Sequence, residues 1–250
     1  MLSKNNFSVL LIIVMILGLA VTALAENEVS VNTSVDFYNR YVWRGLDIAN
    51  TPSIQPALSL GYSGFEIGIW GAYTLSNEMS ESDEIDFWCS YTQEFECGAS
   101  VTAMITDYYF PNAGIDFFNF NNYDATDDEG EPDPGAHTLE AGLSITGPAS
   151  FPITVSGYIN FHNDEGNNTY FQVDYPVMIS ETELNLFCGF TGGSEDNPDY
   201  YGTDEFAFIN VGVSVARDIA VTESFTIPLT VSFIVNPDAE ISYLLAGFSF

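Results

Sequence analysis

Charged residues alternate with apolar residues in segments of the chain that would otherwise suit a lipid environment. Asp36, Arg40 and Arg44 share one parity, while Val35 and Phe37 take the other. A cation that faces lipid at mid-membrane costs about 2 to 4 kcal/mol, whereas a wet interior tolerates charge. Opposed arginines and carboxylates on an inner face would orient a polar solute and set ion preference. The candidate pore-lining residues are Asp36, Arg40, Arg44, Glu66, Trp70, Asp86, Glu140 and Asp174.

The same charges could instead serve only to hold the interior shut. Buried charges generally pair whatever the function, so lumen salt bridges would form in a closed barrel as well. Arg40 and Arg44 are the strongest functional candidates because basic residues are scarce in this chain. The inward-parity aromatic residues Trp70, Trp88, Tyr158 and Phe187 would narrow a pore or fill it as a packed plug. We expect the opposite parity, Val35, Phe37, Tyr41 and Trp43, to face lipid.

The elements that would position these side chains are strands with period-two alternation. From residue 29 onward the chain falls into segments of about ten residues, which is the signature of a membrane barrel. The predicted strands are 29–43, 53–62, 65–75, 84–92, 95–109, 137–146, 152–162, 169–178, 183–191, 205–216, 225–235 and 239–250. We therefore expect an all-β fold, a transmembrane antiparallel up-and-down β-barrel of about twelve strands.

The connections between the predicted strands alternate between short turns and longer loops. Ser63-Gly64 and Gln93-Glu94 are examples of the turns, and residues 44–52 and 110–136 are examples of the loops. Short periplasmic turns and long outer loops are typical of such barrels, whereas a secreted β-sandwich has no reason to alternate in this way. We expect the aromatic half of loop 110–136 to fold into the barrel mouth as a constriction. Aromatic residues near strand ends, among them Tyr41, Trp43 and Tyr108, would form interfacial girdles.

Residues 1 to 25 have the layout of a secretory signal peptide. A basic residue near the start precedes an apolar run from Phe7 to Val21, and Ala25 ends a small-residue triplet. A lone membrane anchor is the alternative, but the apolar run is short for one. We expect cleavage after Ala25, a single barrel domain over residues 26–250, and location in the outer membrane of a Gram-negative bacterium.

The chain is strongly acidic. It contains 35 acidic and 4 basic residues, so its formal net charge is −31. Nucleic-acid binding is excluded because phosphate contacts require a basic surface. Cations are the natural counter-species, either as permeant solutes or as ions that neutralise the surface. An acidic surface adapted to a saline habitat would explain the charge equally well.

Metal and cofactor sites are not indicated. The oxygen-rich segments 110–136 and 163–166 would attract Ca²⁺, but they lack the ordered ligand spacing of an EF-hand. Cys89, Cys97 and Cys188 are too irregular for a zinc site or a disulfide scaffold, although Cys89 and Cys97 could face one another across a hairpin. We expect no metal and no cofactor.

Catalytic motifs are also missing from the sequence. The two histidines are His137 and His162, and no Gly-x-Ser-x-Gly elbow or phosphate-binding loop is present. We expect that the protein is not an enzyme. A membrane-embedded lipid enzyme that uses His162 is the lesser alternative.

One block of the chain resembles a known family. The block is Tyr41-Val42-Trp43-Arg44-Gly45, followed by Pro52, Gln55, Pro56, Gly64, Phe65, Gly68 and Trp70. This order resembles the TorF-type porin family of Gram-negative outer membranes, strongly over residues 38–75 and loosely to about residue 111. The resemblance implies an outer-membrane barrel and suggests a channel.

The carboxyl-terminal segment 239–250 looks like the last strand of an outer-membrane barrel. Resemblance to that class implies that Phe250 is read by the barrel-assembly machinery, and that membrane lipid and lipopolysaccharide surround the protein. We therefore expect a passive diffusion channel for small polar solutes, with a preference for cations. A closed structural or surface-interaction barrel is the main alternative.

Overall fold

The structure, a computed structural model, describes residues 29–180, 182–222 and 225–250. The expected signal peptide, residues 1 to 25, lies outside the described residues. In the described part of the chain, no helix is both long and apolar enough to cross a membrane. Two short 3₁₀ helices are present, η2 (Asn77–Ser82) and η3 (Pro198–Tyr200).

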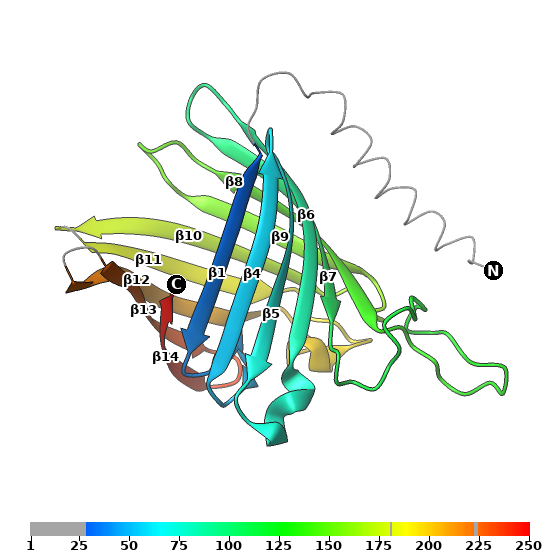
Figure 1. Ribbon diagram of the computed structural model, residues 1–250. Helices are drawn as coiled ribbons and strands as arrows, with labels where there is room; N and C mark the ends of the chain where they lie inside the picture. The colour runs from blue at the N-terminus through cyan, green and yellow to red at the C-terminus, as the bar shows by residue number, and fades with distance from the viewer. Residues whose placement is uncertain (1–28, 181, 223–224) are drawn as a thin grey trace.

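Twelve antiparallel strands form one closed barrel, as predicted (Figure 1). Each strand pairs with its neighbours in the chain, and β14 pairs with β1 to close the ring. In order around the barrel the strands are β1 (Ser30–Tyr38), β4 (Ser53–Tyr62), β5 (Phe65–Thr74), β6 (Glu84–Glu94), β7 (Ser100–Tyr109), β8 (His137–Thr146), β9 (Thr154–His162), β10 (Thr169–Ile179), β11 (Thr182–Thr191), β12 (Ala207–Thr222), β13 (Phe225–Asn236) and β14 (Ile241–Ser249).

The two faces of the wall differ in polarity, because successive strand residues point to opposite sides. Outward positions carry large apolar side chains that are exposed, such as Leu58 at 45% and Leu143 at 50%. Inward positions carry small polar side chains that are buried, such as Ser59, Ser156 and Asn210. The barrel therefore has an apolar exterior and a polar lumen, the opposite of a water-soluble barrel with an apolar core.

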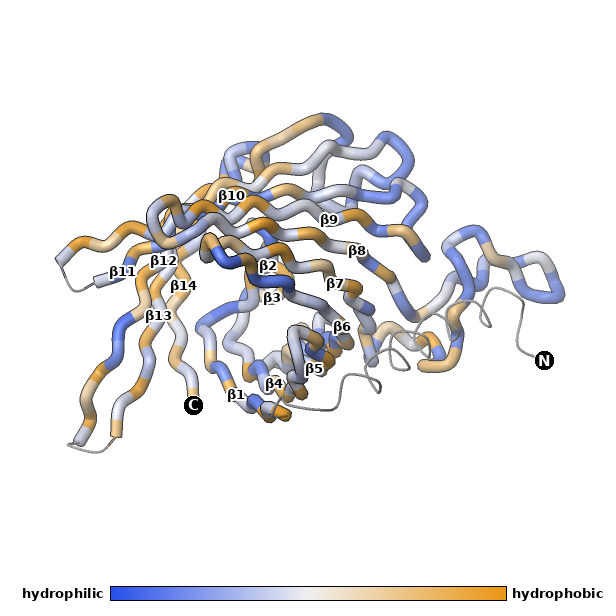
Figure 2. Tube along the Cα trace, turned by 90° about the horizontal axis from the view of Figure 1, so that it is seen from above, coloured by the Kyte–Doolittle hydropathy of each residue, from blue (hydrophilic) through white to orange (hydrophobic). Residues whose placement is uncertain are grey.

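The first predicted strand, 29–43, is wrong in its second half. β1 ends at Tyr38, and the chain turns into the barrel as a hairpin of β2 (Tyr41–Trp43) and β3 (Leu46–Ala49) (Figure 2). Asn39 ends the ladder: its side-chain amide donates to Leu244 O at 3.1 Å, and its Oδ1 accepts from Ala246 N at 2.9 Å. We call residues 41–49 the lumen hairpin.

Tyr41 and Trp43 therefore face the lumen, and the prediction that they face lipid is wrong. Tyr41 is 5% exposed and its ring lies 5.6 Å from that of Trp70. Trp43 contacts Tyr108, which also points inward and does not belong to an outer girdle. The prediction held for Phe37, whose ring stacks on outward Phe248 at 5.1 Å.

Loop 110–136 does not enter the barrel mouth, so that prediction is also wrong. Its Phe117 packs on the outer wall, 5.0 Å from Tyr109 and 6.2 Å from Phe87, both of which point outward. Phe120 stacks on His137 of β8 at 4.0 Å, and part of the loop extends away from the barrel (Figure 1). Phe117 thus contacts the apolar outer face of the wall, while the lumen hairpin lies inside the barrel.

Two of the predicted turns are displaced. The β6–β7 connection is residues 95–99 rather than Gln93-Glu94, since β6 continues to Glu94 and β7 begins only at Ser100. Cys97 lies exposed in this turn, and Cys89 pairs with Ile105, so the possible contact between Cys89 and Cys97 does not form. Strand β12 continues to Thr222 and includes Arg217, which was expected in a turn.

Candidate functional site

The tip of the lumen hairpin is a two-residue turn formed by Arg44 and Gly45. Both have positive φ, +49° and +79°, which is the requirement of a type I′ hairpin turn. A Cβ on Gly45 would lie 1.8 Å from the carbonyl oxygen of Ile209, so only glycine fits against β12. The Asn236 side-chain amide donates to Gly45 O at 3.2 Å. The tip is thus fixed against the wall formed by β12 and β13.

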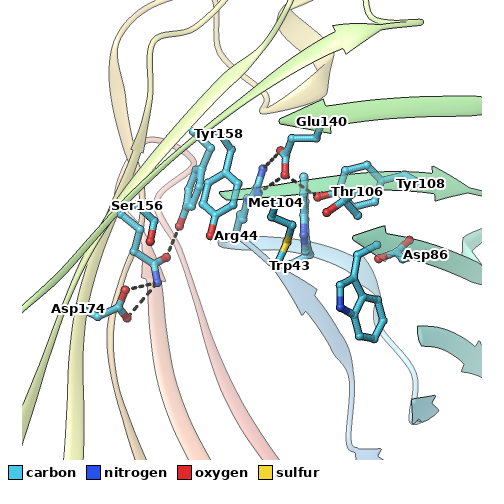
Figure 3. Close-up of a pocket in the computed structure, with 13 residues that line it drawn as sticks. Trp43, Arg44, Asp86, Met104, Thr106, Tyr108, Glu140, Ser156, Tyr158 and Asp174 are labelled. Atoms are coloured by element: carbon cyan, nitrogen blue, oxygen red, sulfur yellow. Dashed lines mark hydrogen bonds and ion pairs between the residues drawn. The ribbon is translucent and has the colours of Figure 1, made fainter. Parts of the chain in front are cut away.

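Arg44 and Glu140 form a two-pronged ion pair inside the barrel (Figure 3). Arg44 Nη1 donates to Glu140 Oε2 at 2.5 Å, and Nη2 donates to Oε1 at 2.8 Å. The two side chains are 10% and 2% exposed, respectively. Tyr108 donates its hydroxyl to Glu140 Oε1 at 2.9 Å. Parallel hydrogen bonds of this kind are strong and fix orientation, so the pair ties the hairpin to β8.

Aromatic rings surround the Arg44 guanidinium. Its central carbon lies 4.4 Å from the ring centres of Trp43 and Tyr158 and 4.6 Å from that of Tyr170. Arg44 also donates to the hydroxyl of Tyr201 at 2.7 Å. Burial raises the pKa of Tyr201 above its ordinary value, so this loop hydroxyl is neutral. We call Trp43, Tyr158, Tyr170 and Tyr201 the aromatic cage.

Arg40, at the base of the lumen hairpin, forms a second and more exposed pair. Its Nη1 lies 3.0 Å from Asp47 Oδ2, and the two side chains are 25% and 22% exposed. Its Nη2 donates to Asn50 Oδ1 at 2.5 Å, and its guanidinium lies 5.5 Å from the Tyr243 ring centre. Arg40 thus links the two ends of the hairpin to each other and contacts β14.

The lumen hairpin lies between two cavities. The first, of about 440 Å³, is bounded by Arg44, Trp43 and the strands β6 to β10. The second, of about 530 Å³, is bounded by Arg40, Trp43 and strands on the opposite side, including β1 and β13. Both cavities reach Asp86. We call them the Arg44 cavity and the Arg40 cavity.

The predicted inward residues lie in the lumen. Those that line the Arg44 cavity are Arg44, Asp86, Glu140 and Asp174, and those that line the Arg40 cavity are Arg40, Trp70 and Asp86. Glu66 borders a third cavity of about 360 Å³ toward the short turns, where it accepts the Trp88 indole N–H at 3.1 Å. Asp36 lies on β1 opposite Gln55, beside Tyr38.

Sequence reasoning placed Glu140 and Tyr158 in the lumen but missed three tyrosines of the site, Tyr108, Tyr170 and Tyr201. Tyr108 and Tyr170 sit at inward parity in their strands, so alternation could have found them. Tyr201 belongs to loop 192–206, and nothing in the local sequence indicates that it enters the lumen. His162, the enzyme alternative, ends β9 opposite Leu139, beside the backbone of loop residue Phe120. Among the described residues, no group of three or more His, Cys, Asp or Glu side chains is placed to hold a metal.

The fold and the site define a closed antiparallel β-barrel with a polar lumen partitioned by an internal hairpin. The chain belongs to a family of bacterial proteins of unknown function (Gcw_chp), whose model matches residues 22–230. A comparison with curated proteins finds no match. Among solved structures, an outer membrane channel from Pseudomonas putida F1 is similar, with 11% identity over 90% of this chain and 95% of that chain and a TM-score of 0.44. The resemblance to TorF-type porins stays a prediction.

Proposed function

We propose that this protein is an outer-membrane channel for the passive diffusion of small polar solutes, with a preference for cations. The observation that carries the proposal is the reversed polarity of the barrel. Exposed apolar side chains such as Leu143 and Phe233 cover the exterior, while the lumen is polar and contains cavities of several hundred Å³. An apolar exterior needs lipid, and a hydrated lumen offers a path across it.

The charges of the lumen support the cation preference. Arg40 and Arg44 are each neutralised by a carboxylate, Asp47 and Glu140 respectively. Asp174 accepts hydrogen bonds from the neutral Gln172 and Asn185 amides, and it forms no ion pair within the described residues. The lumen therefore carries excess negative charge, which attracts cations and repels anions.

Several partners belong to the same proposal. Lipid and lipopolysaccharide would surround the apolar wall, and the barrel-assembly machinery would read Phe250. Phe250 lies at the turn end of the barrel wall, where its ring stacks on that of Phe225 at 6.4 Å, and it is 59% exposed. It is thus accessible beside the last strand. Processing after Ala25 would deliver the chain to the outer membrane.

A closed barrel with a structural or surface role is the second candidate, and the lumen hairpin favours it. The hairpin occupies the lumen between the two cavities. Arg44 joins it to Glu140 of the wall and to Tyr201 of a loop by hydrogen bonds. The two candidates differ in one respect. A channel requires a continuous path past the lumen hairpin, and a closed barrel has none.

Conductance of the refolded protein in planar bilayers tests the proposal. We expect discrete current steps and a reversal potential under a KCl gradient that shows cation preference. A matched variant replaces residues 39–52 with an Asn-Gly turn, which the direct pairing of Tyr38 with Ser53 permits. Larger steps in that variant are expected once the partition is removed. A silent native protein beside a conducting variant would establish the closed barrel instead. Silence in both, with heat-modifiable gel migration confirming folding, would overturn the channel.

A further inference from the structure

Aromatic rings of the lumen lie over inward-facing glycines of the neighbouring strands. A Cβ on Gly68 would lie 2.1 Å from the Trp88 ring, and a Cβ on Gly142 would lie 2.7 Å from the Tyr158 ring. Any larger side chain would push these rings away from the wall. Glycine in a strand commonly marks such a close approach. Both rings therefore lie along the wall and border the Arg44 cavity; the Arg44 guanidinium covers the Tyr158 ring, whereas no such cation contact is made by Trp88 among the described residues.

Two carboxyl groups, those of Asp86 and Asp174, line the same cavity. Asp86 reaches the cavity, and its buried Oδ1 has no hydrogen-bond partner in the part of the chain that the structure describes. Asp174, on the other side, is held by neutral amides alone among the described contacts. An oxygen removed from water and left without a donor costs free energy, which a cation in the cavity would recover.

The chain itself places one organic cation against these walls. The Arg44 guanidinium lies within 4.6 Å of the ring centres of Trp43, Tyr158 and Tyr170. Such rings attract cations through their negative faces, most effectively when the cation is weakly hydrated. The ring of Trp88 is oriented by its hydrogen bond to Glu66 and borders the same cavity. The cavity thus offers a further aromatic ring and carboxyl groups of the kinds that bind Arg44.

We propose that the Arg44 cavity is a binding site for small organic cations, specifically alkylated ammonium and guanidinium ions. The site uses Trp88 as its ring surface, Asp174 as the counter-charge and Asp86 Oδ1 as a hydrogen-bond acceptor. This inference rests on the proposed channel function in one respect: it names the class of solute that the channel selects. The Arg44 cavity has a volume of about 440 Å³, which is large enough for small alkylated ammonium and guanidinium ions.

Binding and permeation are measured separately. Tetramethylammonium chloride is titrated into the refolded protein, and binding is followed by isothermal titration calorimetry, with glucose as the neutral control. We expect saturable binding of tetramethylammonium and none of glucose. Trp88→Leu is expected to weaken binding roughly threefold to tenfold, while Trp88→Phe, which keeps a ring, weakens it less. Trp70→Leu is the matched control, because Trp70 lines the Arg40 cavity.

The two measurements separate the inference from the proposed function. Saturable binding in a protein that passes no current would support the site and overturn the channel. A conducting protein with no saturable binding, or with equal loss on Trp88→Leu and Trp70→Leu, would overturn the site and leave the channel standing. Permeability of tetramethylammonium relative to K⁺, from bi-ionic reversal potentials, should fall in Trp88→Leu if both hold.

Discussion

The buried Arg44–Glu140 pair should couple far more strongly than the exposed Arg40–Asp47 pair. The perturbations are Arg44→Met and Glu140→Gln, alone and together. Removing one partner of a buried pair typically costs 3 to 5 kcal/mol, because the other charge is left unpaired. Two charge-assisted hydrogen bonds link these side chains, which are 10% and 2% exposed. We therefore expect a coupling free energy of about 3 kcal/mol.

The second arginine pair is a matched control within the same hairpin. Arg40 and Asp47 are 25% and 22% exposed, and one ion-pair contact joins them. Pairs that reach water typically contribute up to about 1 kcal/mol. The cycle of Arg40→Met and Asp47→Asn should therefore give a coupling free energy at or below that value.

Equilibrium urea unfolding of the barrel in lipid vesicles measures both cycles. The chain has three tryptophans, Trp43, Trp70 and Trp88, and all three line the lumen cavities, so their fluorescence reports the interior. Arg44→Met should destabilise the barrel more than Glu140→Gln, because Glu140→Gln leaves the aromatic cage around the cation. Equal coupling free energies for the two pairs would refute the conclusion that the Arg44–Glu140 pair is the main contact that fixes the lumen hairpin to the wall.

Three further predictions concern the hairpin and the wall. Gly45→Ala should displace the hairpin tip from β12, because the added Cβ would lie 1.8 Å from the Ile209 carbonyl oxygen. Faster protease cleavage within residues 41–49 of the folded barrel would support this prediction, and unchanged protease resistance would contradict it. Asn39→Ala should destabilise the β1–β14 seam by about 0.5 to 1.5 kcal/mol, measured by urea unfolding, since two exposed backbone groups of β14 lose their partner; no change would show that water replaces the contact. Cys97 should react with a membrane-impermeant maleimide in vesicles, whereas the half-buried Cys89 and Cys188 stay unlabelled; equal labelling would place the strands outside lipid.

Alternation predicted most of the wall because a barrel imposes one rule on every strand. Outward positions are mostly apolar and inward positions are mostly polar, small or aromatic, so strands such as β5 and β8 could be placed almost to the residue. The rule failed where alternation continued into an element that is not part of the wall. The element β2 is a strand, so its residues Tyr41, Val42 and Trp43 alternate between two faces. Both faces of β2 contact protein, and neither faces lipid.

The lumen contacts depended on information that the local sequence lacks. Arg44 adopts positive φ, which is uncommon for a residue with a side chain, so Arg-Gly gave a weaker turn signal than Asn-Gly. Tyr201 reaches Arg44 from a loop 157 residues away, and no periodic pattern links the two. Loop 110–136 has the aromatic composition expected of a constriction, but composition alone does not distinguish packing inside the lumen from packing on the outer wall, where Phe117 lies.

The Tyr41–Gly45 block contacts the barrel wall at three separate places. Tyr41 donates to Glu84 on β6 at 2.6 Å, Arg44 binds Glu140 on β8, and Gly45 abuts Ile209 on β12. The block therefore ties together strands from distant parts of the ring, and each residue type is required by its partner. Asp86 and Asp174 take no part in these ties, although they line the cavity beside them. Substitutions in the block should consequently change how wide the path is, whereas substitutions at the two aspartates should change which ions take it.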